Sequence, residues 1–293
     1  MALAQKLNLP RLDAVKTVAG SLFSKVDPDR VDLFEPELVR LLARTVDRLA
    51  RLYFRMEVEG IENVPHERCL IVGNHNAGIT YLEPIGIGAR WYLERGLNET
   101  LHFLVHDAMV AMPGLKQFLI RTGCVRASHK TADQLLAQGK KVVVFPGGNL
   151  DAFRPYKDRY KIVFGGKKGF IRLALRHGVP IVPMVVAGGH ETFFVLHDGQ
   201  RLARLLGLKK LLRSETCAVF LGLPWGLGVG PIFHWPLPAK STVRFLPPIP
   251  LDAYRPEDAE DSRVLEEIYE KVTQRMQQAM DEIAARRKWP VFG

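Results

Sequence analysis

The sequence predicts an α/β fold: a largely parallel mixed sheet flanked by helices, with amphipathic helical additions at both termini. Short apolar runs at residues 69–72, 142–145 and 181–186 are typical of strands that are buried on both faces. Helical patterns at residues 131–138 and 169–176 lie between these runs. Strands that alternate with helices favour a parallel sheet, because each parallel crossover needs a connecting element.

Helical patterns precede and follow this core. Residues 12–26 have apolar positions at helical spacing, and so do residues 36–55. Residues 257–288 carry an apolar stripe that predicts one long helix. Because the sequence contains no repeats and no low-complexity linker, we expect one domain. Its parts are N-terminal amphipathic helices at 1–55, an α/β core domain at 56–252, and a C-terminal helix at 253–293 packed on the same domain.

A stripe of arginines marks the second N-terminal helix. Arginine recurs there every three or four positions, at Arg40, Arg44, Arg48, Arg51 and Arg55. The stripe fits a helix that packs on the domain with a solvated basic face. It equally fits a helix on a membrane surface, where each basic residue near an anionic leaflet contributes about 1 kcal/mol.

The composition limits the kinds of partner, compartment and metal site that the protein is expected to have. The net charge of +10 over 293 residues indicates a polyanionic partner, either phospholipid headgroups or nucleic acid. Three widely spaced cysteines without a Cys-x-x-Cys pair indicate a reducing compartment, with neither a disulfide framework nor a zinc site. His102 and His106 are four apart, but Phe103 stands where a zinc-protease helix carries Glu, so we expect no metal. The first residues have no apolar stretch typical of a secretory signal.

One long apolar stretch bears on the membrane. Residues 216–235 have the length of a membrane span but contain Pro224, Pro231 and several glycines. Such a run rarely crosses lipid, because its backbone polar groups would lack partners there. We expect a buried or membrane-dipping wall, with Trp225 and Trp235 suited to the interface. The protein is therefore expected to work on a membrane surface without spanning it.

The candidate site begins at the end of the first buried strand, in Gly73-Asn74-His75. Open α/β sheets bind ligands at the carboxyl ends of their strands. Histidine, with an unperturbed pKa near ~6.5, is well suited to proton transfer at neutral pH. A single histidine in such a place is more often structural, so His75 alone leaves both readings open.

A second candidate segment follows the strand at 142–145: Pro146-Gly147-Gly148-Asn149-Leu150-Asp151. Adjacent glycines let a backbone approach a ligand closely and offer N–H groups to an anion, or simply form a tight turn that needs positive φ. Basic and aromatic residues then alternate over 153–170, with Arg154 and Lys168 among them. This mixture could bind nucleic acid, but its place directly after the turn favours a headgroup or nucleotide phosphate.

These segments together resemble the glycerolipid acyltransferase superfamily, in its lysophospholipid acyltransferase-like form. The resemblance is carried by Gly73-Asn74-His75 and the runs at 139–148, 167–175, 178–183 and 188–191, and it covers roughly residues 55–250. The double glycine after Pro146 is similar to the diacylglycerol/monoacylglycerol acyltransferase-like branch, since the other branch usually has Pro-Glu-Gly there.

The resemblance implies that His75 is the general base and that no covalent acyl-enzyme forms. Most of the superfamily supplies an Asp five positions after this histidine, where this chain has Thr80. Glu83 is the preferred replacement as the carboxylate that orients His75, and Asp151 is the alternative. The superfamily's second motif is altered too, because His129 stands where an Arg would follow Gly123.

The expected activity is transfer of a fatty acyl group from acyl-CoA, or acyl carrier protein, to a hydroxyl of a lysophospholipid, acylglycerol or similar lipid acceptor. Acyl-CoA is then a co-substrate, and no separate cofactor is expected. The alternative is a catalytically weakened lipid-binding protein that retains the fold. Expected partners are acyl-CoA, a lipid acceptor and an anionic membrane surface, without nucleic acid, and the expected place is peripheral, on the cytoplasmic face of a membrane. Expected substrate contacts are Asn74, Pro146, Gly147, Gly148, Asn149, Arg154 and Lys168.

Overall fold

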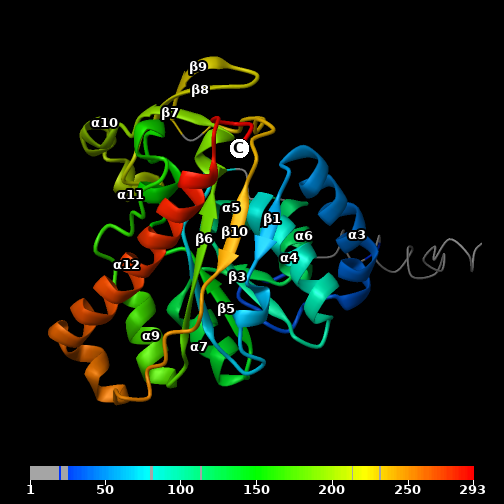
Figure 1. Cartoon of the computed structure of the whole chain (residues 1–293), viewed down its shortest axis with the longest axis vertical. Helices are drawn as coiled ribbons and strands as arrows, with labels where there is room; N and C mark the ends of the chain where they lie inside the picture. Colours follow the sequence, from blue (N-terminus) through cyan, green and yellow to red (C-terminus); the bar gives the residue numbers. More distant parts are fainter. Residues whose placement is uncertain (1–19, 21–25, 80–81, 113, 213, 231) are drawn as a thin grey trace, which may run out of the picture.

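The structure is a computed structural model that describes residues 20, 26–79, 82–112, 114–212, 214–230 and 232–293, without the side chains of residues 82, 83 and 212 (Figure 1). The helix predicted at residues 12–26 therefore lies almost entirely outside the described residues. The predicted fold class is confirmed, because a mostly parallel sheet of seven strands forms the centre and helices cover both of its faces.

The central sheet has the strand order β1-β10-β6-β2-β5-β3-β4. Five neighbouring strands, β6, β2, β5, β3 and β4, pair in parallel, whereas β10 is antiparallel to β6 and parallel to β1. The strands are β1 (Glu57–Glu59), β2 (Leu70–Gly73), β3 (Leu101–Val105), β4 (Cys124–Arg126), β5 (Lys141–Val144), β6 (Ile181–Ala187) and β10 (Thr242–Phe245). The sheet is thus mixed, with its antiparallel part at one edge.

Helices divide between the two faces of the sheet. One face packs against α7 (His129–Ala137), α9 (Gly169–His177) and α12 (Ser262–Arg286). The other packs against α3 (Pro36–Tyr53), α4 (Leu82–Arg95) and α6 (Leu115–Arg121). Alternate residues of β2 show the division, since Leu70 and Val72 belong to the first core and Ile71 to the second. Every residue of β2, β5 and β6 is buried, which explains their unbroken apolar runs.

Shorter elements complete the fold. The short helices are α5 (Asp107–Ala111), α8 (Asn149–Ala152), α10 (Gln200–Leu205) and α11 (Leu208–Leu212), and the 3-10 turns are η1 (Ile61–Asn63), η2 (Tyr156–Asp158), η3 (Gly189–Glu191) and η4 (Pro256–Glu260). The C-terminal helix begins at Ser262, five residues later than the pattern predicted, because the N-cap Asp261 starts it after η4.

The arginine stripe is shorter than predicted. Arg40, Arg44, Arg48 and Arg51 are exposed on α3. Arg55 lies beyond the end of the helix with a φ of 42°, and its guanidinium donates to the carbonyl oxygens of residues 238 and 291. It therefore holds the chain together and does not extend the basic face.

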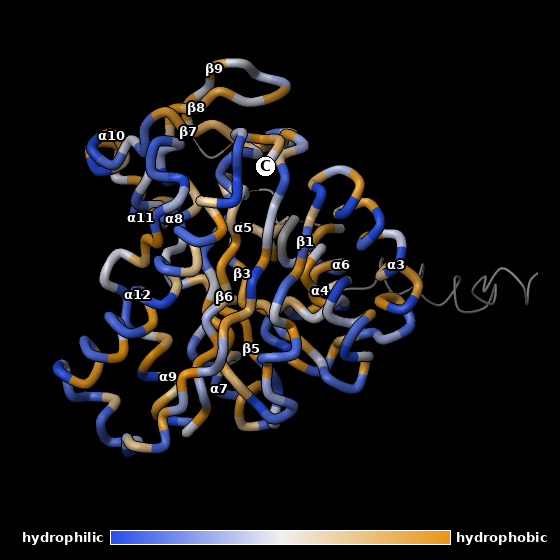
Figure 2. The backbone as a smooth tube through the Cα atoms, in the orientation of Figure 1, coloured by the Kyte–Doolittle hydropathy of each residue, from blue (hydrophilic) through white to orange (hydrophobic). Residues whose placement is uncertain are grey.

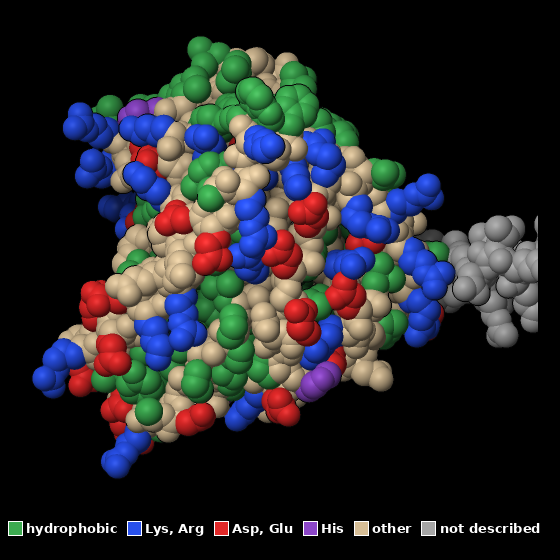
Figure 3. All heavy atoms as spheres, in the orientation of Figure 1, with side chains coloured by type: hydrophobic (Ala, Val, Ile, Leu, Met, Phe, Trp, Pro, Cys, Tyr) green, Lys and Arg blue, Asp and Glu red, His purple; other side chains and the backbone are tan. Residues whose placement is uncertain are grey.

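A separate three-stranded antiparallel sheet lies at one end of the molecule, formed by β7 (Phe194–His197), β8 (Val219–Gly222) and β9 (Gly226–Val229). It contains most of the apolar stretch 216–235. Of the two expectations for this stretch, a buried or a membrane-dipping wall, burial does not hold for its hairpin, because Leu221, Trp225 and Leu227 are all more than half exposed. Figures 2 and 3 show this apolar end at the top of the molecule. Among the described helices, none has the length and apolarity of a bilayer span.

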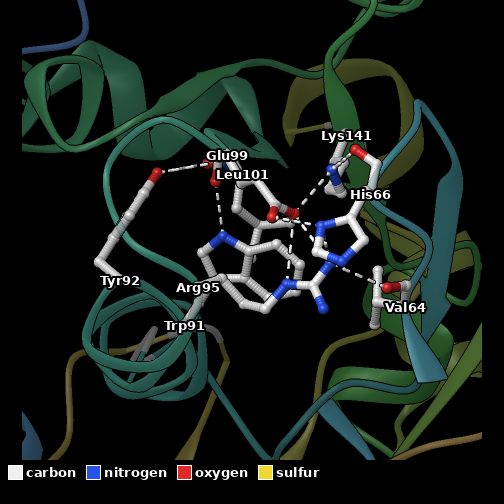
Figure 4. A network of polar contacts seen from close by, with 8 residues as sticks. All are labelled: Val64, His66, Trp91, Tyr92, Arg95, Glu99, Leu101 and Lys141. Atoms are coloured by element: carbon white, nitrogen blue, oxygen red, sulfur yellow. Dashed lines mark hydrogen bonds and ion pairs between the residues drawn. The ribbon is translucent and has the colours of Figure 1, made fainter. Parts of the chain in front are cut away.

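In the central sheet, a network of charges around Glu99 lies at the amino ends of β3 and β5 (Figure 4). The Glu99 carboxylate lies 2.7 Å from His66 Nδ1, 2.9 Å from Arg95 Nη2 and 3.1 Å from Lys141 Nζ. Burial acts to raise the pKa of Glu99, but the hydrogen bonds from these three groups outweigh it and lower the pKa to about 2. Lys141 opens β5 and is buried, so Glu99 provides a counter-charge for it.

Candidate active site

Three neighbouring central strands end in polar loops at the same edge of the sheet. β2 is followed by Asn74-His75, β5 by the turn at 145–149, and β6 by η3. β2 pairs with β5 on one side and with β6 on the other, so their carboxyl ends are adjacent. The segments that the sequence singled out are therefore brought together, at the edge where open α/β sheets bind ligands.

The backbone of His75 is held from two sides. Its N–H donates to Asp151 Oδ2 at 2.5 Å, and its carbonyl oxygen accepts from His190 Nε2 at 3.1 Å. The imidazole ring stacks on Phe145, with ring centroids 4.7 Å apart and planes inclined by 22°. These contacts fix the loop that carries the ring.

The surroundings of His75 keep its imidazole in the neutral form. Burial lowers its pKa to about 3, and the positive charges of Lys167 and Arg154 act in the same direction. The imidazole is therefore neutral at neutral pH, which is the form a general base requires.

Asp151 and Arg154 form a buried ion pair beneath the site. Arg154 Nη1 lies 2.6 Å from Asp151 Oδ1, and both side chains are almost completely buried. Burial raises the pKa of Asp151 to about 6, against the opposing effects of Arg154 and the His75 N–H. Arg154, an expected substrate contact, is thus engaged with Asp151 and with the carbonyl of Arg159.

The two candidate orienting carboxylates differ in what the structure describes. Asp151 reaches the backbone N–H of His75. The side chain of Glu83 lies outside the described residues, as does Thr80, the residue at the superfamily's Asp position. The choice between Glu83 and Asp151 as the group that orients the imidazole therefore stays a prediction.

Asn74 ties β2 to β6. Its amide donates to the carbonyl of Val186 at 2.9 Å and accepts from the N–H of Val186, also at 2.9 Å. The side chain is fully buried. This placement favours a positioning role, because Asn74 continues the strand pairing where the β2 ladder ends at Gly73.

The double glycine has a separate structural reason at each position. A Cβ on Gly147 would lie 2.3 Å from Asp151 Cβ and 2.4 Å from the carbonyl oxygen of Val163. Gly148 has a φ of +54°, which favours glycine. The turn therefore packs closely against Asp151 and Val163, and it places the Asp151 carboxylate at the backbone N–H of His75. Asn149 follows as the first residue of α8.

Lys167, the chain neighbour of the expected contact Lys168, reaches the double-glycine turn. Lys167 Nζ donates to the carbonyl of Gly147 at 3.2 Å. Lys168 Nζ instead donates to Glu266 Oε2 on α12 at 2.5 Å. The sequence did not indicate Lys167, because the conformation of the preceding loop decides which of two adjacent lysines points toward the turn.

η3 is anchored by a buried carboxylate that the sequence analysis left without a role. Glu191 accepts from the Tyr160 hydroxyl at 2.6 Å, from the Val291 N–H at 2.6 Å, and from Arg287. The neighbouring His190 is buried, which lowers its pKa well below the ordinary value. Glu191 therefore joins the chain's last helix to the turn that places His190 against His75. The run Gly188-Gly189-His190-Glu191 was a signal for it.

An apolar cavity of about 490 Å³ adjoins the His75 loop. Asn76 and Gly189, next to His75 and His190 in the chain, form part of its wall. The remaining walls come from α3, the start of α4, and the segment at 233–236. Its apolar lining includes Leu49, Tyr53, Met56, Ile85, Phe233 and Trp235.

A cleft of about 300 Å³ lies beyond Phe145, the residue stacked on His75. Pro146, Lys167 and His129 line it, together with apolar residues of α7 and α9. His129, where the superfamily has Arg, is the first residue of α7, and Ser128 caps that helix through the N–H of Thr131. The neighbours of His75 thus line both spaces, since Asn76 belongs to the wall of the apolar cavity and Phe145 to the wall of the cleft that contains Lys167.

Metal binding has no support from the described residues, among which no three His, Cys, Asp or Glu side chains cluster as metal ligands. His102 is buried in the core near Phe34, and His106 caps α5 by accepting from the N–H of Ala108.

Comparison with known proteins identifies the family. Residues 55–187 match the family model for the Acyltransferase family. An uncharacterized protein of Mycobacterium tuberculosis is 31% identical over 284 residues, which cover 95% of this chain and 76% of that protein. Human 2-acylglycerol O-acyltransferase 3 is 27% identical over 66% of this chain and 58% of its own length. Xenopus laevis diacylglycerol O-acyltransferase 2 is 25% identical over 61% of this chain and 54% of its own length.

A solved structure shares the fold. The crystal structure of the 1-acyl-sn-glycerophosphate (LPA) acyltransferase PlsC from Thermotoga maritima matches with a TM-score of 0.53 and 17% identity, covering 94% of this chain and 90% of that one. Together with the family model and the relatives, this resemblance confirms the prediction that the sequence motifs carried. The chain belongs to the glycerolipid acyltransferase superfamily.

Proposed function

We propose that this acyltransferase moves a fatty acyl group from acyl-CoA, or acyl carrier protein, to a hydroxyl of a lysophospholipid, acylglycerol or similar lipid. One observation carries the proposal: the neutral imidazole of His75 has its chain neighbour Asn76 in the wall of an apolar cavity and its stacking partner Phe145 in the wall of a cleft with a lysine. Such a site suits a reaction between a long apolar chain and a polar carrier.

In the proposed reaction His75 accepts the proton of the acceptor hydroxyl as its oxygen attacks the thioester carbonyl. The tetrahedral intermediate then collapses, the carbon–sulfur bond breaks, and the thiolate takes the proton from the imidazolium. No bond forms between enzyme and acyl group. The low pKa of His75 makes it a weak base but keeps it neutral and so able to accept a proton.

The two cavities suit different parts of the substrates. The apolar cavity, at about 490 Å³, falls within the ~300–1,000 Å³ typical of small-molecule pockets, and we assign it to an acyl chain. Lys167 and His129 line the other cleft, and we assign them to the phosphate-bearing part of a substrate. Pro146 lines this cleft and Gly147 and Gly148 directly follow it, and their predicted substrate contacts stay part of the proposal.

The carboxylate that supports His75 belongs to the proposal as well. Asp151 positions the His75 loop through the backbone N–H, and Glu83 keeps its predicted role as the group that orients the imidazole. Asn74 and Arg154 support the loop from within the protein.

The test is thioester consumption with a panel of lipid acceptors. His75→Ala should lose roughly two to four powers of ten in rate, with unchanged circular dichroism. His197→Ala, which alters an exposed histidine of β7, is the matched control and should retain full activity. Thioester consumption that is equal in all three proteins would falsify the assignment. Lipid extracts from cells with and without the protein would identify the acceptor.

The second candidate is a lipid-binding protein with weakened catalysis. Thr80 and His129 favour it, because both stand where the superfamily has catalytic or phosphate-binding residues. In that case an acyl lipid would bind the apolar cavity stoichiometrically, while parent and His75→Ala would both show only background consumption.

A further inference from the structure

The three-stranded sheet carries an unusually apolar surface. Six side chains of the β8–β9 hairpin and the segment after it are between 51% and 68% exposed: Leu221, Leu223, Trp225, Leu227, Phe233 and Trp235. We call these residues the apolar tip. Residues 216–239 contain no Asp, Glu, Lys or Arg. The apolar surface is therefore unbroken by charge, which marks it as an interaction site.

Positive charge borders the tip on two sides. α10 and α11 lie in the chain between β7 and β8 and carry the exposed cations Arg201, Arg204 and Lys210, while Lys209 is paired with Glu215 at 2.8 Å. Residues 199–212 contain no acidic residue. On another side, the end of α3 contacts the tip through a hydrogen bond from Trp235 Nε1 to the Tyr53 hydroxyl at 3.1 Å, and Arg48 and Arg51 are exposed there. Figure 3 shows the hydrophobic end with Lys and Arg below it.

We propose that the apolar tip docks on an anionic phospholipid bilayer at the depth of the headgroups. This surface goes beyond the proposed reaction and assigns the hairpin a partner. An apolar centre with a cationic rim matches a leaflet whose headgroups are negative and whose interior is apolar. Trp225 and Trp235 suit the interface between these two layers.

The geometry limits the depth of docking. Among the described strands β9 pairs with β8 alone, so it is an edge strand there and one side of its backbone has no ladder partner in the described chain. Open sheet edges do not enter the hydrocarbon region, because their N–H and C=O groups would lose water without gaining partners. The hairpin therefore lies among the headgroups and the adjacent acyl boundary.

The charge pattern favours a bilayer over a second copy of the chain. Two copies that met tip to tip would bring the same cationic rims together, and like-charge contacts across an interface are costly. An anionic leaflet instead offers opposite charge to the whole rim.

The apolar cavity opens at the tip. Leu49, Phe233 and Trp235 line that cavity and are each 58–59% exposed. The same side chains therefore border both the site and the docking surface. If the proposed reaction is correct, an acyl chain enters from the bilayer and reaches the His75 loop without crossing water.

The first test measures cosedimentation with vesicles of phosphatidylcholine alone and of phosphatidylcholine with phosphatidylglycerol. Leu227→Glu places a negative charge on β9, outside the cavity walls, and should weaken binding to the anionic vesicles at least about tenfold. Leu93→Glu is the control, since it makes the same change at an exposed leucine of α4. It should bind like the parent.

The second test removes charge. The double variant Arg48→Gln/Arg201→Gln takes one cation from each side of the rim and should weaken binding to anionic vesicles by roughly tenfold to thirtyfold. Lys271→Gln/Arg275→Gln removes the same charge from the exposed face of α12 and should bind like the parent.

Three results would overturn the docking surface. One is equal binding of the parent to neutral and anionic vesicles, and another is equal binding of Leu227→Glu and Leu93→Glu. The third is a parent dimer in solution that Leu227→Glu makes monomeric while vesicle binding stays unchanged. Vesicle binding needs no turnover, so a failure of the proposed reaction would leave these results decisive. Leu227→Glu should consume a water-soluble short-chain thioester at the parent rate.

Discussion

His75 shows how a site can be fixed through its backbone. Asp151 holds the N–H of His75, His190 holds the carbonyl, and Phe145 covers one face of the ring. The sequence could predict the position of His75, because the histidine follows a buried strand. It could not predict that Asp151 reaches the backbone, since that contact depends on the shape of the Gly147-Gly148 turn.

The imidazole of His75 should remain neutral over the physiological range. Burial lowers its pKa to about 3, whereas a histidine at its ordinary pKa of ~6.5 titrates in that range. Its ring-proton NMR signal, assigned by its loss in His75→Gln, should stay at the neutral position between pH 8 and pH 5. A midpoint near pH 6.5 in the ligand-free protein would contradict the burial argument.

Asp151→Asn should cost both stability and activity. The change leaves the buried guanidinium of Arg154 without its counter-charge, and breaking such a pair costs about 3–5 kcal/mol. Urea unfolding measures the loss of stability.

Glu83→Gln, by contrast, should lower the rate nearly as far as His75→Ala if Glu83 orients the ring. Two results together would give the orienting role to Asp151. One is full activity in Glu83→Gln, and the other is a loss of activity in Asp151→Asn that is larger than its loss of folded protein.

The elements differ in how far the sequence could predict them. β2, β5 and β6 were predictable, because strands buried on both faces give continuous apolar runs. The choice of Lys167 over Lys168 was not, since it depends on a loop with positive φ at Gly165 and Gly166. The exposure of the β8–β9 hairpin was equally hidden, because an apolar run reads the same whether it faces a core or a bilayer.

On α3, the arginines of the basic stripe contribute differently to stability. Arg51 Nε lies 2.9 Å from Asp47 Oδ2, and Asp47 is 2% exposed, with Arg90 farther away at 3.8 Å. Arg51→Gln should therefore destabilise the protein by about 1–3 kcal/mol, because it weakens the pairing of a buried carboxylate. Arg48→Gln, on the exposed face three residues earlier, should stay within about 0.5 kcal/mol of the parent. Equal denaturation midpoints for the two variants would exclude this role for Arg51.

Across the whole molecule, the candidate site lies at the carboxyl ends of the central strands, whereas the Glu99 network, drawn in Figure 4, lies at the amino ends of β3 and β5. β5 links them, because it begins at Lys141 beside Glu99 and ends next to Phe145 beside His75. The network holds the strand at its start, while the reacting groups are gathered at its end. Changes at Glu99 should thus affect stability more than turnover.

The Glu99 network should make stability depend on pH in acid. The pKa of Glu99 is about 2 in the folded protein and 4.5 in its reference state, so its contribution is complete above pH 4.5 and is lost as pH falls through 2. Glu99→Gln should lower the free energy of unfolding at pH 7 by about 3 kcal/mol. The difference in free energy of unfolding between Glu99→Gln and the parent should become smaller between pH 4.5 and pH 2.

Glu67→Gln is the matched control, because Glu67 is exposed nearby. It should stay within about 0.5 kcal/mol of the parent at pH 7. A gap between Glu99→Gln and the parent that stays constant down to pH 2 would show that charge on Glu99 is not the source of the effect.

The central place of β2 also has a consequence for how the protein is made. The Asn74 side chain bonds to Val186, 112 residues later in the chain. At ~5–20 residues per second, a ribosome needs roughly 6 to 22 s to synthesise that interval. The loop that carries His75 therefore emerges early but acquires its β6 partner late, and until then only the β5 side of β2 can be paired. Translation speed and chaperone supply should govern the yield of active protein more than the final stability does.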